Sequence, residues 1–223
     1  MEIADIAVLI VLILSIVLHE MAHGYAANWL GDPTARLQGR LSPNPLVHID
    51  PLGSVIIPAL LFISNAGFLF GWAKPVPYNP YNLSDQRYGE AKVAAAGPAV
   101  NLLLAFIFAM IIRLAEPLAL SEAFLTLASY IVFINILLAL FNMLPFPPLD
   151  GSKIIGAILP YRAAHRYREL MMAVERYGFI VLFVGLFIII QVIWPYLFAA
   201  VLEVASLMTG LTPSEFYGFI RLL

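Results

Sequence analysis

The sequence has no cysteine and little charge, and both absences limit what the protein can be. Without cysteine there is no disulfide, no thiolate nucleophile and no sulfur ligand, so any bound metal must use His, Asp or Glu. Only 12% of the 223 residues are charged, against about 25% in ordinary soluble domains, and 62% are hydrophobic. With a mean hydropathy of +0.91, this composition excludes a water-soluble enzyme and predicts a protein within a lipid bilayer. The net charge of −2 gives no reason to expect a nucleic-acid partner.

Long apolar stretches predict an all-α, polytopic helical bundle, because a membrane-spanning helix needs about 20 mostly apolar residues. The stretches expected to cross are Ile3–Leu30, Val93–Ile112, Ala123–Leu149 and Tyr177–Leu202. The first lacks the basic start and the cleavage site of a signal peptide, so we expect it to remain in the protein. A further apolar segment, Tyr196–Met208, fits either a fifth span or a surface helix.

The stretch Gly53–Trp72 is apolar but interrupted by Pro58 and by the Ser-Asn-Ala-Gly run at 64–67, so it either spans the bilayer or dips in and returns. Lys and Arg near span ends gather on the cytoplasmic side. If the N-terminus is outside and the segment dips, only Arg113 lies outside, leaving the C-terminal tail aside. The cytoplasmic residues are then Arg36, Arg40, Lys74, Arg87, Lys92, Lys153, Arg162, Arg166, Arg168 and Arg176. A crossing would place most of these outside, so we predict a re-entrant segment, buried in protein or lining a wet cavity.

Residues 161–176 are basic and amphipathic. The basic side chains are Arg162, Arg166 and Arg168, and the apolar run is Leu170–Met172. This pattern predicts a helix lying on the inner leaflet.

The first helix contains the sequence His19-Glu20-Met21-Ala22-His23. Two histidines spaced by four residues share one helical face, so both imidazoles can bind one ion, and Glu20 can reach a water on it. Zinc is the natural occupant of such a pair. Ionisable residues inside a membrane cost at least about 2.5 kcal/mol each, so three within five positions point to function. The alternative is a polar cluster that joins helices.

A catalytic zinc needs a third protein ligand and one open position. Asp150 is the candidate, because it follows the span Ala123–Leu149 within the segment Asn142–Gly151. Three prolines in four positions there predict an extended, polyproline-like strand, and Gly151 allows a tight turn after it. The alternative is an ordinary helix end with a solvated aspartate.

Depth links the two motifs. His19 lies about 24 Å along the first helix at about 1.5 Å per residue, and Asp150 follows the end of a full span. Both can reach one ion only if the two spans run in the same direction, which requires Gly53–Trp72 to dip. Charge counting and ligand geometry therefore agree on a re-entrant segment.

Three motifs together resemble the site-2 protease family of zinc intramembrane metalloproteases. They are His19-Glu20-x-x-His23, the Gly-Pro-Ala-Val-Asn sequence at 97–101, and Asn142–Gly151. The resemblance implies one Zn²⁺ per chain, with His19, His23 and Asp150 as metal ligands and Glu20 as catalytic base. It also implies a transmembrane protein substrate, often a membrane-anchored regulator cut within the bilayer.

The chemistry of these residues is consistent with that resemblance. Zinc lowers the pKa of a bound water to about 7, and Glu20 would take its proton and pass it to the leaving amine. Asn142 is the candidate donor to the oxyanion or the substrate, or else a contact between helices. We expect one protease domain over residues 1–223, with a catalytic core at about 3–155 and C-terminal helices at about 160–223.

A helical substrate must unwind before attack, and an extended protein edge can hold the unwound segment by strand addition. Pro145 and Pro147 mark one candidate edge, Pro145–Leu149. Trp72 marks the other candidate edge, the returning segment Phe68–Pro77, which is typical of short prokaryotic family members. The alternative for that limb is an interfacial tryptophan with a proline-rich loop.

Other polar residues have open roles. His48 could act as a gate, an inhibitory ligand or an oxyanion donor, or be an ordinary loop histidine. Asn101 and Asn135 lie in apolar spans, where such side chains usually cross-link helices. His165 is interpreted as a solvated residue of the basic helix.

The resemblance to short prokaryotic members implies the plasma membrane of a prokaryote, with the active site towards the cytoplasm. Neither the periplasmic peptide-binding domain nor the nucleotide-binding module of larger members is visible, so we expect substrate choice to rest on the membrane core or a separate partner. Two alternatives stay open, a zinc transporter and an inactive homologue that binds single-span proteins. A transporter predicts ionisable residues spread over several spans, and an inactive homologue predicts loss of Glu20 or a ligand.

Overall fold

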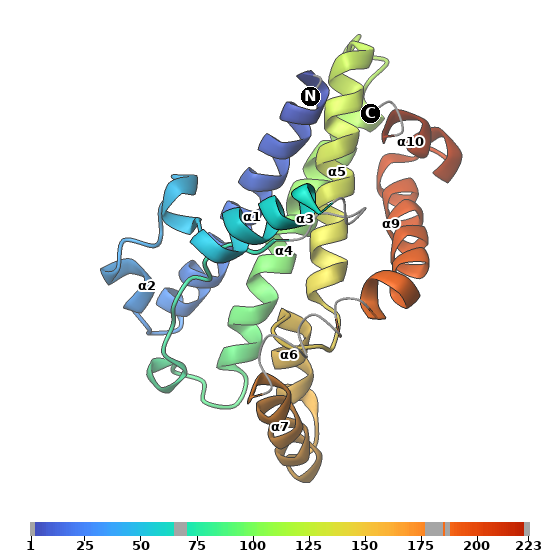
Figure 1. Ribbon diagram of the computed structural model, residues 1–223. Coiled ribbons are helices and arrows are strands. Elements are labelled where there is room, and N and C mark those ends of the chain that lie inside the picture. Colours follow the sequence, from blue (N-terminus) through green and yellow to red (C-terminus); the bar gives the residue numbers. More distant parts are fainter. Residues whose placement is uncertain (1–2, 65–70, 177–184, 186–187, 221–223) are drawn as a thin grey trace.

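A computed structural model of the protein describes residues 3–64, 71–176, 185 and 188–220 (Figure 1). These residues are mainly helical, and the described part contains no β-strand. The α-helices are α1 (Ile3–Trp29), α2 (Thr34–Leu37), α3 (Ile57–Ile63), α4 (Gly89–Arg113), α5 (Glu122–Asn142), α6 (Asp150–Ile158), α7 (Tyr161–Arg176), α9 (Trp194–Thr209) and α10 (Pro213–Ile220). The short 3-10 or π helices are η1 (Pro45–His48), η2 (Pro51–Ile56), η3 (Pro80–Asn82) and η4 (Ile189–Ile193).

Four helical stretches are long and apolar enough to cross a membrane. They are Ile6–Trp29, Gly89–Arg113, Glu122–Asn142 and Gln191–Thr209. This finding confirms the predicted all-α, polytopic class, and the first three stretches correspond to the three spans expected before Asp150.

Tyr196–Met208 belongs to the fourth stretch, Gln191–Thr209, which is long and apolar enough to span, and its crossing stays a prediction. Pro195 lies in the first turn of α9, where proline is tolerated, and η4 leads directly into that turn. Part of the predicted span Tyr177–Leu202, residues 177–184 and 186–187, lies outside the described residues.

Helix α4 occupies the centre of the bundle and contacts α1, α5, α6 and α9. Small side chains are fully buried where these helices meet, including Ala105 and Ala109 of α4, Ala128 of α5 and Ala205 of α9. Lipid gives little hydrophobic drive for helix association, so the close packing that alanine permits stabilises the bundle. This packing fixes α1 against α4, the pair that carries most of the site.

The segment 51–79 folds back on itself. Its first part forms η2 and α3, which run across the long helices in Figure 1, and residues 71–79, hereafter the return limb, come back without helical structure. The Trp72 amide donates to the Gly53 carbonyl at 3.1 Å, and the Ser54 hydroxyl donates to the Trp72 carbonyl at 2.8 Å. The two ends of Gly53–Trp72 are therefore adjacent. Residues 65–70 lie outside the described part, and entry into the bilayer stays a prediction.

The proline-rich segment after α5 is not extended, so the predicted polyproline-like strand at Pro145–Leu149 is wrong. The Phe146 amide donates to the Leu144 carbonyl at 2.8 Å, and the Leu149 amide donates to the Phe146 carbonyl at 2.9 Å. These short-range bonds fold the segment into consecutive turns. Proline excludes an α-helix here but is compatible with turns as well as with extended chain.

The basic segment is helical, as predicted, and forms α7 beside α6 (Figure 1). The side chains of Arg162, Arg166 and Arg168 are exposed. His165 is also exposed, with Nδ1 3.5 Å from Glu169. The predicted position of α7 on the inner leaflet stays a prediction.

Candidate metal centre

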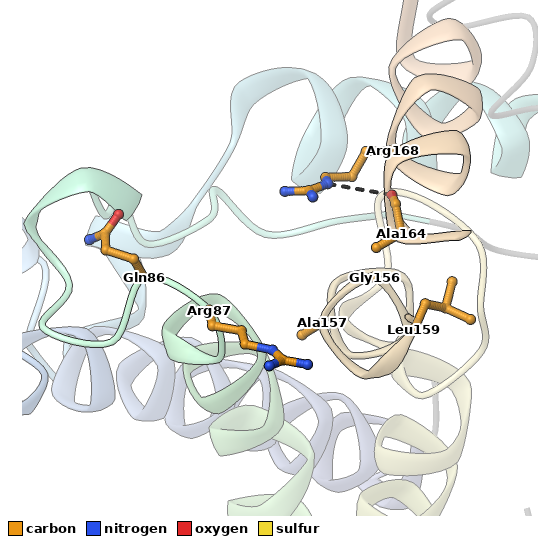
Figure 2. Close-up of a pocket in the computed structure, with 7 residues that line it drawn as sticks. All are labelled: Gln86, Arg87, Gly156, Ala157, Leu159, Ala164 and Arg168. Carbon is orange, nitrogen blue, oxygen red and sulfur yellow. Dashed lines mark hydrogen bonds between the residues drawn. The ribbon is translucent and has the colours of Figure 1, made fainter. Parts of the chain in front are cut away.

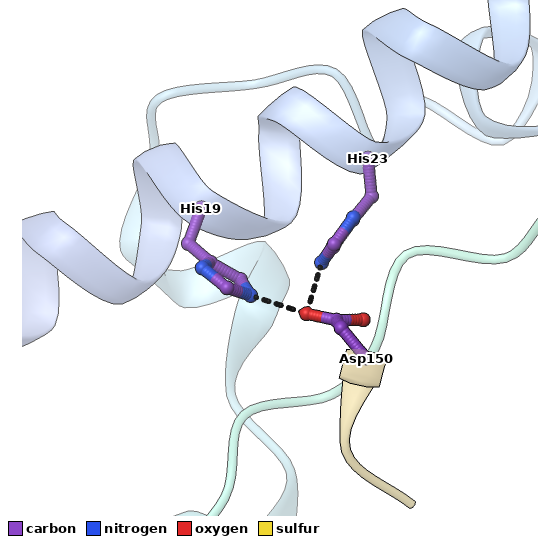
Figure 3. A group of neighbouring side chains, drawn as sticks. All are labelled: His19, His23 and Asp150. Atoms are coloured by element: carbon purple, nitrogen blue, oxygen red, sulfur yellow. Dashed lines mark hydrogen bonds and ion pairs between the residues drawn. The ribbon is translucent and has the colours of Figure 1, made fainter. Parts of the chain in front are cut away.

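Three potential ligands converge from two distant parts of the chain (Figure 3). His19 and His23 lie one turn apart on α1, and Asp150 is the first residue of α6. Oδ2 of Asp150 lies 3.2 Å from Nε2 of His19 and 3.3 Å from Nε2 of His23. One ligand atom from each residue lies within 4.8 Å of the others, and all three residues are buried. The arrangement predicted from the two motifs is therefore present and could hold one metal ion.

Each histidine is oriented by a hydrogen bond at its other ring nitrogen. Nδ1 of His19 contacts Oδ1 of Asn101 at 2.5 Å, and Nδ1 of His23 contacts the Val93 carbonyl at 2.7 Å. Both partners are acceptors, so each Nδ1 carries a proton. Each Nε2 faces Asp150, where it shares a proton with the carboxylate or, with a metal bound, would present its lone pair. Both imidazoles are thus oriented to bind a metal through Nε2.

Asn101 belongs to a buried network across three helices. Its amide donates to Oδ1 of Asn135 on α5 at 2.8 Å and to the Ser15 carbonyl on α1 at 3.4 Å. Asn135 in turn donates to the Ser15 hydroxyl at 2.9 Å. The predicted cross-linking role of the two asparagines is present. The contact with His19 was missed, because helix periodicity does not show which residues of different spans meet.

Gly97 makes the ligand geometry possible. A Cβ atom at this position would lie 2.6 Å from both Cε1 and Nε2 of His19, and 2.6 Å from Cε1 of His23. Only glycine lets α4 approach the imidazoles this closely. Gly97 opens one of the motifs noted in the sequence, yet its steric role depends on a contact between α1 and α4.

Gly151 has a different role from the one predicted. It is a helical residue of α6 and does not have a positive φ. A Cβ atom there would lie 2.1 Å from the Met143 carbonyl oxygen, so glycine is required for close contact between α6 and the turn after α5. This contact places Asp150 at the end of that turn.

Glu20 lies beside the ligands in a cavity of about 120 Å³. Its Oε2 atom accepts a hydrogen bond from the Val76 amide of the return limb at 2.8 Å. Pro75, Val76 and Tyr78 line the same cavity. The return limb therefore forms a wall of the site. The role of Phe68–Pro77 as an edge for the unwound substrate stays a prediction, and residues 68–70 lie outside the described part.

Lys153 and Tyr78 also line this cavity, and sequence reasoning did not single them out. The Lys153 amine lies 5.3 Å from the centroid of the Tyr78 ring. Burial by itself lowers the pKa of Lys153, but its interactions with Tyr78, Asp150 and Glu90 outweigh it and raise that pKa. The cavity thus holds a protonated amine opposite its carboxylates.

The electrostatics also keep the aspartate ionised. Burial by itself raises the pKa of Asp150, but hydrogen bonds with His19 and His23 outweigh it and lower that pKa to about 2. An ionised carboxylate facing the Nε2 atoms of two imidazoles is a donor set that a cation can bind in place of the shared protons.

The remaining predicted residues after α5 are placed as follows. Asn142 lines the cavity, and its amide donates to the Leu138 carbonyl at 2.9 Å, one turn earlier in α5. Pro148, which was not singled out, lines the cavity, whereas Pro145 is exposed and Pro147 is buried outside the lining.

His48 and Trp72 make contacts outside the cavity lining. His48 is 2% exposed, and its Nε2 contacts the Ser42 carbonyl at 2.9 Å. Its own carbonyl accepts from the Lys74 amide at 2.8 Å. Trp72 packs its indole against Gly53, and neither His48 nor Trp72 is among the residues that line the cavity.

The fold and the site define a polytopic helical membrane protein with a buried group able to hold one metal ion. Comparisons with known proteins agree. The model of "Peptidase family M50" matches residues 111–185. The chain is 41% identical over 197 residues to "Putative zinc metalloprotease YwhC" of Bacillus subtilis, covering 84% of each protein.

More distant relatives carry similar names. The chain is 29% identical over 172 residues to "Putative zinc metalloprotease Rip2" of Mycolicibacterium smegmatis, covering 77% of this chain and 63% of that protein. It is 41% identical over 64 residues to "Putative zinc metalloprotease MJ0611" of Methanocaldococcus jannaschii, covering 29% of this chain. No solved structure matches the chain. The chain belongs to peptidase family M50, the site-2 protease family.

Proposed function

We propose that the protein is a zinc-dependent intramembrane protease that cuts membrane-anchored proteins within or near their transmembrane segments. The observation that carries the proposal is the meeting of His19, His23 and Asp150 beside Glu20 in one cavity. Family membership supports it, because the relatives are named as zinc metalloproteases.

The residues present fit zinc. Two imidazole nitrogens and one carboxylate are the donor types of catalytic zinc sites, which use three protein ligands and keep one position open. Asn101 and the Val93 carbonyl supply the outer contacts that such histidines need. When bound, zinc supplies an activated water and polarises the scissile carbonyl.

Glu20 is the proposed general base and acid. The Val76 amide holds one of its carboxylate oxygens, and the other is assigned to take a proton from water and deliver it to the leaving amine. Asn142 carries a second amide proton besides the one directed at Leu138, and this proton is assigned to the substrate carbonyl.

The return limb is the proposed edge for the unwound substrate. It has no helical structure, it lines the cavity through Val76, and Arg40 holds the Lys74 carbonyl at 2.7 Å. An extended chain bound along it would pass the metal ligands and Glu20. The folded turns at Pro145–Leu149 offer no equivalent edge, so the return limb is the proposed binding edge for the substrate.

The proposed orientation is supported by charge. If 51–79 dips, the ten basic residues counted above flank one side of the bundle, which favours metal ligands that face the cytoplasm. The proposed prokaryotic plasma membrane is supported by the resemblance to short family members. The proposed partner is a transmembrane protein substrate, and enzyme and substrate lie in the same lipid bilayer.

Two other functions are weaker. A zinc transporter would distribute ligands along a path, but the described residues contain one such group, at a single depth. An inactive homologue would have lost Glu20 or a ligand, and the chain retains all four residues.

The test compares wild type with Glu20→Gln in proteoliposomes that contain a single-span substrate with a helix-weakening Asn-Pro pair. We expect wild type to cleave it, a zinc chelator to stop cleavage and added zinc to restore it. Glu20→Gln should bind zinc with unchanged stoichiometry and cleave at least about 1000-fold more slowly, in line with loss of a general base. Undiminished cleavage by this variant would refute the mechanism, and zinc flux across the same vesicles would favour a transporter.

A further inference from the structure

A second cavity lies apart from the metal ligands, at the junction of the α4 N-terminus, α6 and α7 (Figure 2). Its volume is about 410 Å³, within the range of small-molecule sites, about 300–1,000 Å³. Gln86 and Arg87 line it on the side that precedes α4, and Arg168 of α7 lines it from another direction. Its other walls are apolar, formed by the end of α6 (156–159) and by Ala164.

The cavity lies at the level where two apolar helices leave the hydrocarbon. Arg87 comes just before Gly89, the first residue of the apolar stretch of α4. The lining of α6 follows α5, whose apolar stretch ends at Asn142. Both ends lie at the same end of the bundle as α7 (Figure 1). If these apolar stretches cross the bilayer, the cavity is at headgroup depth, where lipid phosphates lie.

The charge of the cavity is positive. Its lining includes two arginines and no acidic side chain. Two acidic residues adjoin the lining in sequence, and both have other partners: Asp85 pairs with Lys92 at 2.6 Å, and Glu169 with His165 at 3.5 Å. In the part of the chain that the structure describes, neither Arg87 nor Arg168 forms a salt bridge.

The guanidinium groups keep donors for a ligand. Nε of Arg168 donates to the Ala164 carbonyl at 3.4 Å, which leaves its other guanidinium donors available. The Arg87 guanidinium lies 4.8 Å from the Tyr88 ring centroid. A planar guanidinium offers paired donors that match phosphate oxygens. Gln86 adds no free amide donor, because its Nε2 atom lies 2.5 Å from the Leu83 carbonyl and 3.3 Å from the carbonyls of Pro80 and Tyr81.

We propose that this cavity binds the phosphate group of an anionic membrane phospholipid. The two arginines would hold the phosphate from opposite sides, and the apolar wall of α6 and Ala164 would contact the glycerol and the start of the acyl chains. Basic pockets between membrane helices favour anionic headgroups in this way. A bound lipid would connect α4, α6 and α7 directly, and α6 carries Asp150.

The experiment uses the full-length protein in a neutral detergent and titrates phosphatidylglycerol or phosphatidylcholine, with thermal unfolding and native mass spectrometry as readouts. The test variant is Arg87→Gln with Arg168→Gln. The matched control is Arg162→Gln with Arg166→Gln, which removes the same charge from exposed positions of α7 outside the cavity. Circular dichroism and zinc content verify that both variants are folded.

We expect wild type and control to bind phosphatidylglycerol in preference to phosphatidylcholine. The cavity variant should bind phosphatidylglycerol at least roughly tenfold more weakly, because each lost charge-assisted hydrogen bond weakens binding by about that factor. Equal loss in both variants would show general surface electrostatics and overturn the proposal. Inorganic phosphate alone competing at millimolar concentration would assign the cavity to a soluble anion and overturn the lipid.

A second measurement on wild type covers the case in which the cavity variant does not fold. Photoactivatable phosphatidylglycerol is crosslinked to the protein and the modified peptides are sequenced. Crosslinks at 86–87 and 156–168 support the site, and crosslinks confined to the outer faces of α1 and α9 contradict it.

Discussion

Gly97 of α4 faces His19 of α1 at a distance that leaves no room for a side chain. A Cβ atom at Gly97 would lie 2.6 Å from Nε2, the very atom that points to Asp150. Two carbon or nitrogen atoms in ordinary contact are about 3.5–4.0 Å apart. The packing of the central helix therefore sets the position of the ligand.

Replacing Gly97 with alanine should remove the metal site while leaving the bundle folded. The added methyl must push His19 and His23 away or separate α1 from α4, and a displaced ligand binds zinc poorly. We expect substoichiometric zinc by elemental analysis and no detectable cleavage. The matched control is Gly156→Ala, whose Cβ would meet Tyr167 at 3.7 Å, an ordinary contact. Full zinc occupancy in Gly97→Ala would contradict the steric argument.

Replacing Asn101 with alanine should weaken zinc binding by about 10- to 100-fold, the usual effect of losing an outer partner of a metal-binding histidine. The side chain that orients His19 would be gone, whereas the ligands themselves remain. Asn135→Ala is the control, because Asn135 joins the same network without touching a ligand. Competition with a zinc-binding dye measures both affinities. Equal weakening in the two variants would mean that the network acts only through helix packing.

Val76→Pro should slow cleavage by about 10- to 100-fold, since it removes the amide that donates to Glu20, and hydrogen bonds to charged groups contribute about 1.5–3 kcal/mol. Val76→Ala keeps that amide and trims only the side chain, so it should retain most activity. Rates are compared at saturating substrate and equal zinc content. If the two variants lose activity equally, the side chain rather than the amide matters.

The sequence was sufficient to predict that the three candidate ligands meet. His19 and His23 share a face by helix geometry, and depth along the spans brings Asp150 to the same level. The helical class likewise follows from apolar length. These inferences depend on the helix repeat and the bilayer thickness, which are the same in every membrane protein.

What could not be predicted depends on contacts between elements. The role of Gly97 and the contact between Asn101 and His19 arise where α1 packs on α4, and no periodicity shows that register. The turns at Pro145–Leu149 were mistaken for a strand because proline excludes helix without choosing among the other conformations. Lys153 lines the cavity because of where α6 lies, and the sequence has no distinct signal for the position of α6.

The absence of cysteine allows the predicted topology to be tested with single introduced cysteines. Gln38 and Tyr81 flank the segment 51–79, and Glu116 lies between α4 and α5; all three are exposed. If the segment dips, Gln38→Cys and Tyr81→Cys label from the cytoplasmic side and Glu116→Cys from the outside. Spheroplasts treated with a membrane-impermeant maleimide provide the measurement. Labelling of Gln38→Cys and Tyr81→Cys from opposite sides would show a crossing.

Asp32 offers a test of how the return limb is fixed to α1. Its buried carboxylate accepts from the Asn79 amide at 2.6 Å and from Nδ2 of Asn82 at 2.8 Å, beyond the end of α1. Asp32→Asn replaces one acceptor oxygen with a donor, so about 1–3 kcal/mol of stability should be lost, seen as a lower unfolding midpoint. Asp85→Asn is the control, because Asp85 pairs with Lys92 at the surface and should matter little.

The pH dependence identifies the cause of that loss. Burial by itself raises the pKa of Asp32, but hydrogen bonds from Thr34, Asn82 and Asn79 outweigh it, so the pKa lies below the ordinary 3.8. A carboxyl group whose pKa falls on folding stabilises the protein above its unfolded pKa, and this stabilisation is lost as the pH falls through the folded value. The gap in unfolding midpoint between wild type and Asp32→Asn should be full at neutral pH and narrow below pH 3.8. Because Asp150 titrates in both proteins, it cancels from the difference. A gap that stays constant on acidification would assign the effect to packing instead of charge.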